Sequence, residues 1–286
     1  MRPTLRTLRW SLWLGWQIES NWTEPWLFVL YVAAKPVTGS LLLVFMFRAA
    51  ARASAGVSLD LLPFSYAGNA VYMLAGAVGF GMSAAVVTDR EHYGMLKYVR
   101  VSPAGQQSYL VGRGLAQGAQ GLLGAVITFG AGLVLPLGLR EALARQPVAW
   151  GWLALHLGLG LVMLLALGLL LAGVVLNMAR HGMFLSEGVG SALYLLSGAV
   201  FPLNVLPAGL RDLGLWLPPT YWLEGVRRAL LGDAAAQPAL RAWTHADLAL
   251  ALAASTLGLV VLAQVVFRWG ERRARRLGRF DLTTGF

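Results

Sequence analysis

The stretch WGWLALHLGLGLVMLLALGLLLAGVVL, residues 150–176, decides the fold class because its 27 residues include no Asp, Glu, Lys or Arg. About 20 helical residues cross the roughly 30 Å hydrocarbon layer of a bilayer, so a run of this length predicts a membrane span. Backbone polar groups have no water partner there, so the span should be a helix. The alternation of polar and apolar residues that is typical of barrel strands is absent.

The composition of the whole chain agrees with a membrane protein. Of the 286 residues, 57% are hydrophobic and 13% are charged, whereas a soluble domain carries about 25% charged residues. The absence of Cys excludes a disulfide framework, a thiolate metal site and a Cys nucleophile. The net charge of +10 indicates loops that lie against anionic lipid rather than a nucleic-acid partner.

Six apolar stretches predict an all-α membrane protein with about six transmembrane helices in one domain, residues 1–286. The fifth stretch is short and ends at Pro202. Before the first span, residues 1–24 predict an interfacial helix, with Leu5, Leu8, Leu12 and Trp16 on one stripe. After the last span, residues 268–286 form a basic cytosolic tail. The predicted spans are Trp26–Phe47, Tyr66–Val87, Tyr109–Leu135, Trp150–Leu176, Phe184–Phe201 and Ala246–Phe267.

The distribution of basic residues predicts the orientation of the spans. The termini and the loops on their side of the predicted membrane hold 14 Lys and Arg residues when Arg113, just inside the third span, is included, and the opposite loops hold 8. Basic residues are enriched in cytoplasmic loops. We therefore expect a multi-pass protein of the plasma (inner) membrane with both termini in the cytoplasm.

Between the second and third spans lies a charged segment, TDREHYGMLKYVRVSPAG, residues 88–105. Asp89 and Glu91 come early and Lys97 and Arg100 late, an order that suits the dipole of one short helix. The segment ends at Ser102-Pro103, because the residue before proline avoids the helical region. The segment is thus predicted to be a short, rigid cytosolic helix, with a solvated loop as the alternative.

After the fifth span comes FPLNVLPAGLRDLGLWLPPTYWLEGVRRALLG, residues 201–232. This stretch is too polar and Pro-broken to span a membrane and too apolar for a free loop. We expect residues 202–240 to form short helices that fold back into the outer leaflet, packed against protein. Glu224 has Arg227 and Arg228 at helical spacing, which indicates either a local ion pair or a part in an outer gate.

The two segments together resemble the type-2 export permeases of the ATP-binding cassette (ABC) superfamily. That family has an acidic residue, a Gly, an apolar-basic run and Ser-Pro in a cytosolic coupling helix that docks on the ATPase. It ends the fifth span with Ser-Gly, Phe-Pro, a further Pro and Pro-x-x-Tyr-x-x-Glu-x-x-Arg. The resemblance implies ATPase coupling by Glu91, His92, Gly94, Leu96, Lys97, Ser102 and Pro103, and an outer gate or re-entrant region with Phe201, Pro202, Pro207, Pro218, Tyr221, Glu224 and Arg227.

The chain lacks the G-x-x-x-x-G-K-[ST] phosphate loop, so ATP hydrolysis is expected in a separate chain. We expect no catalytic, metal-binding or cofactor-binding residue here. The resemblance implies a pair of ABC ATPase subunits that bind ATP and Mg²⁺, a second permease chain in a homodimer or heterodimer, and contact with membrane lipid. It also implies export of a drug-like compound, a lipid or a lipid-linked glycan.

Lys35 lies in the middle of the first predicted span, where a charge costs about 3 kcal/mol or more. It is a candidate for lining the path of a polar or anionic substrate; alternatively, it pairs with Glu187 or extends its amine to the interface. A stripe of glycines, 114, 118, 121 and 124, allows close helix packing either within the chain or with a second copy. A secondary transporter or channel remains the alternative function, although internal repeats and intramembrane acids typical of that class are not evident.

Overall fold

In the computed structural model the chain is a bundle of helices, described over residues 3–20, 24–53, 61–102, 105–135, 139–178 and 181–280. Within these ranges the backbone forms no strand. The α-helices are α1 (Pro3–Ser20), α2 (Pro25–Ala53), α3 (Leu61–Leu74), α4 (Gly81–Glu91), α5 (Leu96–Val101), α6 (Gln106–Val134), α7 (Leu139–Arg145), α8 (Trp150–Val175), α9 (Gly182–Leu196), α10 (Ala208–Trp216), α11 (Pro218–Leu231) and α12 (His245–Arg276). Short 3₁₀ turns lie at Leu203–Val205, Asp233–Ala235 and Pro238–Leu240.

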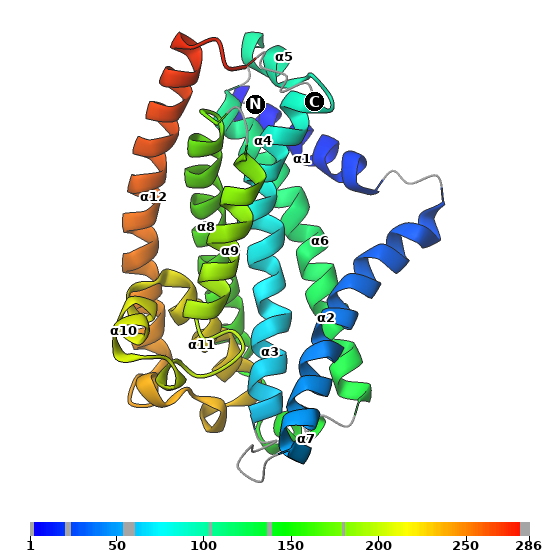
Figure 1. The fold of residues 1–286 in the computed structure, drawn as a ribbon, viewed down its shortest axis with the longest axis vertical. Coiled ribbons are helices and arrows are strands. Elements are labelled where there is room, and N and C mark those ends of the chain that lie inside the picture. Colours follow the sequence, from blue (N-terminus) through cyan, green and yellow to red (C-terminus); the bar gives the residue numbers. More distant parts are fainter. Residues whose placement is uncertain are drawn as a thin grey trace.

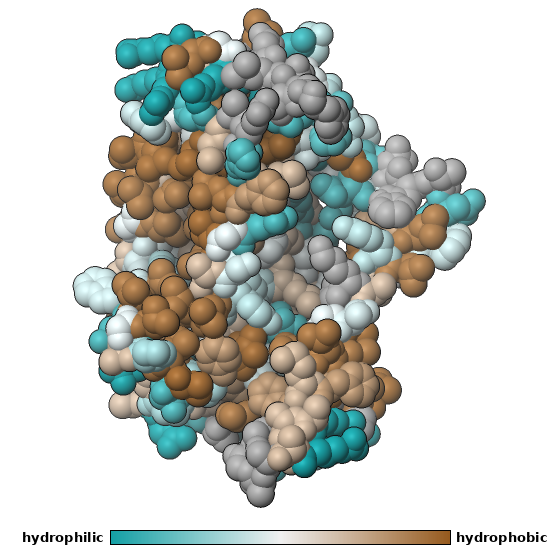
Figure 2. All heavy atoms as spheres, in the orientation of Figure 1, coloured by the Kyte–Doolittle hydropathy of each residue, from teal (hydrophilic) through white to brown (hydrophobic). Residues whose placement is uncertain are grey.

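The bundle has two ends, which Figure 1 shows at the top and the bottom. One end carries α1, α5 and the C-terminal turns of α12, and we name it the α5 end. The other carries α7, α10 and α11, and we name it the α11 end. Figure 2 shows apolar residues around the middle of the molecule and hydrophilic residues at both ends, as expected for a protein that spans a bilayer.

Five helical stretches of the described chain are long and apolar enough to cross a membrane. They coincide with the first four and the last of the predicted spans. The second runs without a break from Leu61 to Glu91, because a π-helical segment, Ala75–Phe80, joins α3 to α4. The five stretches are Trp26–Ala53, Leu61–Glu91, Gln106–Val134, Trp150–Val175 and His245–Arg276.

The predicted fifth span corresponds to α9, an apolar helix of 15 residues. The prediction extended this helix to Phe201, but it ends at Leu196. Gly198, two residues further, adopts a φ of 72°, a left-handed conformation that glycine accepts readily and that terminates helices. At the other extreme, α12 continues nine residues past the predicted Phe267, so the first part of the basic tail is helical.

The N-terminal segment is a helix, as predicted. It lies against α6 through Ser11 and Gly15, both buried, whereas Leu5 and Leu12 of the predicted stripe are exposed. A side-chain carbon on Gly15 would lie 2.9 Å from Ala116. Small residues on α1 therefore set its contact with the bundle, because they let the two helices approach closely.

Close approach through glycine also joins α8 to α12. A Cβ on Gly270 would lie 2.0 Å from the carbonyl oxygen of Gly173, so only glycine fits at this position. Asn177 reinforces the contact by donating its amide to the carbonyl of Gly270 at 2.9 Å. On α6, three glycines of the predicted stripe face Met82, Val78 and Ala77 of the same chain, so they serve packing within the chain (Gly114, Gly118 and Gly121).

We predict that Gly270→Ala lowers the free energy of unfolding by about 1–3 kcal/mol, because the added methyl group forces α12 away from α8. The matched control is Gly258→Ala on the same helix, where an added Cβ meets no atom within 4 Å. That variant should be neutral or slightly stabilising, because alanine favours the helix. Thermal unfolding of the two variants in detergent measures both effects; equal losses would contradict this account of the α8–α12 contact.

Candidate functional site

The segment between α4 and α5 is a corner, and the prediction of a single helix over residues 88–105 was wrong. The membrane helix continues as α4 to Glu91, the chain turns at His92 and Tyr93, and α5 begins at Leu96. Gly94 has a φ of 58°, a left-handed conformation that separates the two helices. Asp89 and Glu91 therefore lie at the C-terminal end of α4, and the expected stabilisation by the dipole of α5 does not exist.

The short helix α5 is anchored on one side and open on the other. Leu96 is buried in an apolar cluster of the α5 end that includes Tyr109 and Phe267. Tyr98 and Val101 are 67% and 83% exposed. Of the other predicted coupling residues, His92 and Lys97 are exposed, and Glu91 and Gly94 are partly exposed. Ser102 donates its hydroxyl to the carbonyl of Val99 at 2.9 Å. Pro103 lies outside the described residues.

Behind this corner lies a buried polar cluster that joins α4 to α6. Asp89 is fully buried and accepts a hydrogen bond from the Tyr109 hydroxyl at 2.7 Å. Its other oxygen lies 3.3 Å from Nη2 of Arg113, whose side chain is also buried. A buried charge needs a partner, so this contact fixes the C-terminal turn of α4 against the first turns of α6.

Sequence reasoning placed Asp89 in a short cytosolic helix, with a solvated loop as the alternative, and did not connect it with the third span. The signal was present: Tyr109 and Arg113 are four residues apart and so lie on one face of a helix. A charge that enters a span should face a partner inside the protein. Arg113 was the charge that required this partner, and Glu91 and Asp89, 22 and 24 residues before it, were the nearest acids along the chain on the same side.

We predict that Asp89→Asn destabilises the protein by about 3–5 kcal/mol, because it leaves the buried Arg113 without a counter-charge. Asn keeps nearly the same shape and can still accept the hydrogen bond from Tyr109. The control is Asp212→Asn, which breaks an exposed ion pair with Arg211 and should cost less than about 1 kcal/mol. Thermal unfolding in detergent tests both, and a harmless Asp89→Asn would mean that Arg113 needs no counter-charge.

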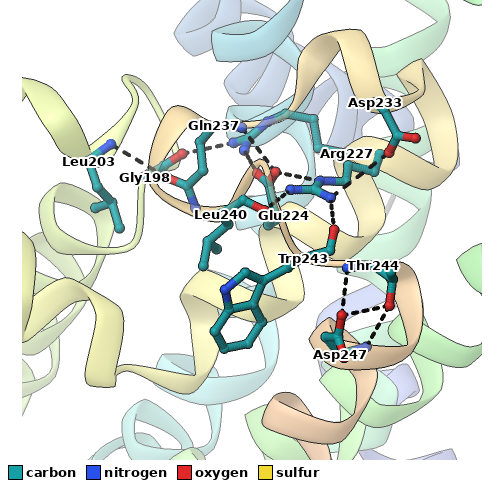
Figure 3. A network of polar contacts seen from close by, with 11 residues as sticks. Gly198, Leu203, Glu224, Arg227, Asp233, Gln237, Leu240, Trp243, Thr244 and Asp247 are labelled. Atoms are coloured by element: carbon teal, nitrogen blue, oxygen red, sulfur yellow. Dashed lines mark hydrogen bonds and ion pairs between the residues drawn. The ribbon is translucent and has the colours of Figure 1, made fainter.

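At the α11 end, the Glu224 carboxylate is the centre of a second buried network, shown in Figure 3. One oxygen accepts from Nη1 of Arg227 at 3.0 Å. The other accepts from Nε of Arg228 at 2.8 Å and from the backbone amide of Gln237 at 3.0 Å. The side chains of Glu224, Arg227 and Arg228 are each 2% exposed or less. The local ion pair predicted from the sequence is thus present and includes both arginines.

The two arginines connect α11 to its surroundings through backbone carbonyl groups. Arg227 donates from Nη2 to the carbonyl of Gly198 at 2.8 Å, in the turn after α9. Arg228 donates to the carbonyls of Leu240 and Trp243, in the segment that leads to α12. One carboxylate on α11 therefore holds together the chain before α11 and the chain after it. The carbonyl groups that follow α9 and precede α12 have no partner within a regular helix, and the guanidinium groups satisfy them.

The same network contacts α3. The guanidinium carbon of Arg227 lies 3.5 Å from the ring centre of Phe64, an attractive cation–π geometry. One turn further, a Cβ on Gly68 would lie 2.0 Å from the carbonyl oxygen of Ala199. Glycine at position 68 thus lets the turn after α9 reach α3. Burial lowers the pKa of Arg227 to about 10, while Glu224 opposes this shift, so the guanidinium remains protonated at neutral pH.

The sequence profile of the ABC-2 type transporter family matches residues 8–231. The chain belongs to this family. The match covers the α4–α5 corner and the outer segment from Phe201 to Leu231, which includes Glu224, Arg227 and Arg228. No relative was found among proteins of curated function. Members of the family are membrane components of ABC transporters and are not themselves catalysts; the chain is thus a multi-pass permease component of an ABC transporter.

The other predicted residues of the outer region in this ABC-2 permease surround the network. Pro218 is the first residue of α11, where its fixed φ suits a helix start. Tyr221 donates its hydroxyl to the carbonyl of Leu215 and stacks on Trp243, with ring centres 5.5 Å apart. Pro202 is buried next to Leu203, Phe201 is half-buried, and Pro207 precedes the first residue of α10. These residues shape the chain around α10 and α11.

A capping motif at the start of α12 was missed in the sequence. Thr244 accepts from the backbone amide of Asp247 at 3.2 Å, and the Asp247 carboxylate accepts from the amide of Thr244 at 2.8 Å. This reciprocal arrangement satisfies two amides that a helix start leaves unpaired. The pattern Thr-x-x-Asp before an apolar run was the available signal. It fixes where the last span begins, one residue before the predicted Ala246.

The candidate residue Lys35 lies on α2, which is helical through positions 35 and 36. The side chains of Lys35 and Pro36 lie outside the described part of the structure. The alternative partner, Glu187, is exposed on α9 and has no ion pair or hydrogen bond with any described residue. A role for Lys35 in a substrate path thus stays a prediction.

We predict that Glu224→Gln in this ABC-2 permease costs about 3–5 kcal/mol of stability, because two buried guanidinium groups lose their counter-charge. Asp233→Asn is the matched control. Asp233 is the other acid near Arg228, but it is 84% exposed and 3.9 Å away, so its loss should cost less than about 1 kcal/mol. The measurement is thermal unfolding of the purified chain. A Glu224→Gln variant as stable as the control would show that this carboxylate does not stabilise the buried network.

Proposed function

We propose that this chain is the membrane-spanning permease subunit of an ABC exporter and that it works with a separate pair of ATPase subunits. The ATPase pair would bind ATP with Mg²⁺, and the permease would move the substrate outward. The observation that carries the proposal is the combination of the ABC-2 family match with an α5 helix whose open side has no partner in the described chain. The family match favours this function over a secondary transporter or channel.

The exposed side of α5 is suited to docking on another protein. Tyr98 and Val101 present apolar surface at the α5 end, and Lys97 lies 5.4 Å from the ring centre of Tyr98. Aromatic residues surrounded by polar ones are typical of the energetic centres of interfaces. Leu96 holds the helix on the bundle from the opposite side. A force on α5 would therefore reach α4 and α6 directly.

The Asp89 cluster supports a role in passing that force to the spans. It lies immediately before the corner and joins α4 to the first turns of α6. Nucleotide-driven closure of the ATPase pair would move α5, and the buried ion pair would make α4 and α6 move with it. Binding of ATP must favour one of two states of the permease for such coupling to supply energy.

At the α11 end we propose an outer gate formed by the segment from Phe201 to Leu231. The Glu224 network supports this because it holds α11, the turn after α9 and the start of α12 as one unit. A unit of this kind can move as a rigid body when the spans rearrange. We place it at the outer face, with the termini and α5 in the cytoplasm, because basic residues are more numerous at the α5 end.

The proposed assembly contains two permease chains, the same or related, and the substrate would pass along their interface. The substrate class that the sequence resemblance suggests is a drug-like compound, a lipid or a lipid-linked glycan. Lys35 is proposed to line the path, because a charged residue within a span is favoured only where it faces protein or water. The membrane is proposed to be the plasma (inner) membrane.

We predict that Tyr98→Ala weakens assembly with the ATPase subunit by about 2 kcal/mol, or roughly thirtyfold in Kd, because an exposed aromatic anchor is lost. ATP hydrolysis stimulated by the permease should fall in parallel. The experiment co-expresses the permease with a candidate ABC ATPase subunit from the same genome and measures co-purification and ATP hydrolysis.

The control is Trp216→Ala, which removes an 83% exposed aromatic side chain from α10 at the opposite end. It should leave assembly unchanged. If Tyr98→Ala assembles normally, or if Trp216→Ala disrupts assembly instead, α5 is not the docking element.

A further inference from the structure

Glu187 is an exposed carboxylate on an apolar helix. It lies in the second turn of α9, and neighbouring exposed residues on the same helix include Met183 and Phe184. Its carboxylate has no ion pair or hydrogen bond with any described residue, unlike the buried acids Asp89 and Glu224. A carboxylate on an apolar membrane helix is favoured where it faces water, protein or a polar ligand rather than lipid.

Other polar groups continue from Glu187 along the same side of α9. Ser191 and Tyr194 follow at four and seven residues, so the three side chains form one stripe of the helix. Tyr194 donates its hydroxyl to Oδ1 of Asn69 on α3 at 2.7 Å. Asn69 in turn donates its amide to Ser40 of α2 at 2.8 Å. The polar stripe thus begins at an acid that has no partner among the described residues and ends where α9, α3 and α2 meet.

Aromatic rings accompany the stripe. The rings of Tyr72 and Tyr194 lie 4.9 Å apart, and the Tyr72 hydroxyl donates to the carbonyl of Gly190 at 2.7 Å. Both hydroxyl groups are thereby used as donors. Tyr72 is buried, so the half-buried ring of Tyr194 is the one that a ligand could contact. Ring faces and carboxylates share one preference: both attract cations.

The stripe also has space beside it. Gly188, Ser191 and Ala192 are exposed, and a Cβ on Gly188 would meet no atom within 4 Å. Figure 2 shows pale and teal residues on this face between two apolar areas. A ligand could therefore reach the stripe while its apolar part stays beside the apolar surface.

We infer that Glu187 binds the cationic group of the transported substrate, so that this permease selects amphipathic organic cations. The inference rests on the proposed transport function for its biological meaning. The binding step itself needs only this chain, because all groups of the stripe belong to it. Ser191 and the half-buried ring of Tyr194 would then contact the remainder of the ligand.

The test compares two probes of the same size and shape and of opposite charge, tetraphenylphosphonium and tetraphenylborate. Equilibrium binding of each is measured to the full-length chain in lipid nanodiscs, with empty nanodiscs subtracted. We expect the chain to bind the phosphonium more tightly than the borate. Glu187→Gln should weaken phosphonium binding about tenfold or more and leave borate binding unchanged, because only one charge is removed.

Glu141→Gln is the matched control, since Glu141 is also an exposed carboxylate but lies on α7 at the α11 end. It should bind both probes as the unmodified chain does. Glu187→Gln should unfold at the same temperature as the unmodified chain, because it breaks no contact with a described residue. The inference is overturned if the chain binds the borate more tightly than the phosphonium, which is what a path governed by Lys35 would give. It is also overturned if Glu187→Gln binds the phosphonium as tightly as the unmodified chain does.

The remaining explanation for the exposed carboxylate of Glu187 is that a second copy of the chain covers it. The oligomeric state of Glu187→Gln, measured by light scattering, separates it from ligand binding. If the variant loses a dimer while its phosphonium affinity stays the same, Glu187 is an interface residue and the inference fails. Failure to find an ATPase partner would instead count against the proposed function and would leave the binding result unaffected.

Discussion

The structure depends on the pairing of charges that the fold takes out of water. Asp89 at the α5 end and Glu224 at the α11 end are both fully buried, and each lies against buried arginines. An isolated buried charge would cost far more than a single packing contact returns, so these acids can be buried only together with their partners. Asp89 lies on α4, and its partners lie on α6. The arginines that pair with Glu224 lie on α11 itself but also bind the chain before and after this helix. Pairing therefore fixes how α4 meets α6 and how α11 meets the chain on either side.

One long helix connects these two charged regions. The stretch from Leu61 to Glu91 contacts the Glu224 network through Phe64 and ends at the Asp89 cluster. Glycine at position 68 permits close contact with the turn after α9. Buried charges hold both ends of this continuous helical stretch. A displacement of the α4–α5 corner would therefore be transmitted along it to the α11 end. The geometry thus suits a protein whose two ends must change together.

Much of the fold followed from the apolar pattern, and the errors followed from contacts that no pattern reveals. Five spans were located correctly, although two of them extend six and nine residues past their predicted ends, because long runs without charge can satisfy their backbone only as helices. The corner at Gly94 was predicted as one helix because charge order alone cannot show that a glycine takes a left-handed conformation. Asp89 was placed in solvent for a related reason, since its partners, Tyr109 and Arg113, follow it by 20 and 24 residues. The face of α1 that packs on α6 consists of small residues, which carry little hydrophobic signal.

The sequence by itself determined that the chain is a helical membrane protein, where most spans lie, and which family it resembles. Those features depend on length, charge and local motifs, each of which can be read along the chain. Only the tertiary structure decided which charges are buried, which glycines are contact points, and that Glu187 stands without a partner among the described residues. The physical reason is that pairing and close packing are properties of neighbours in space, and the folded bundle brings together residues that the sequence keeps far apart.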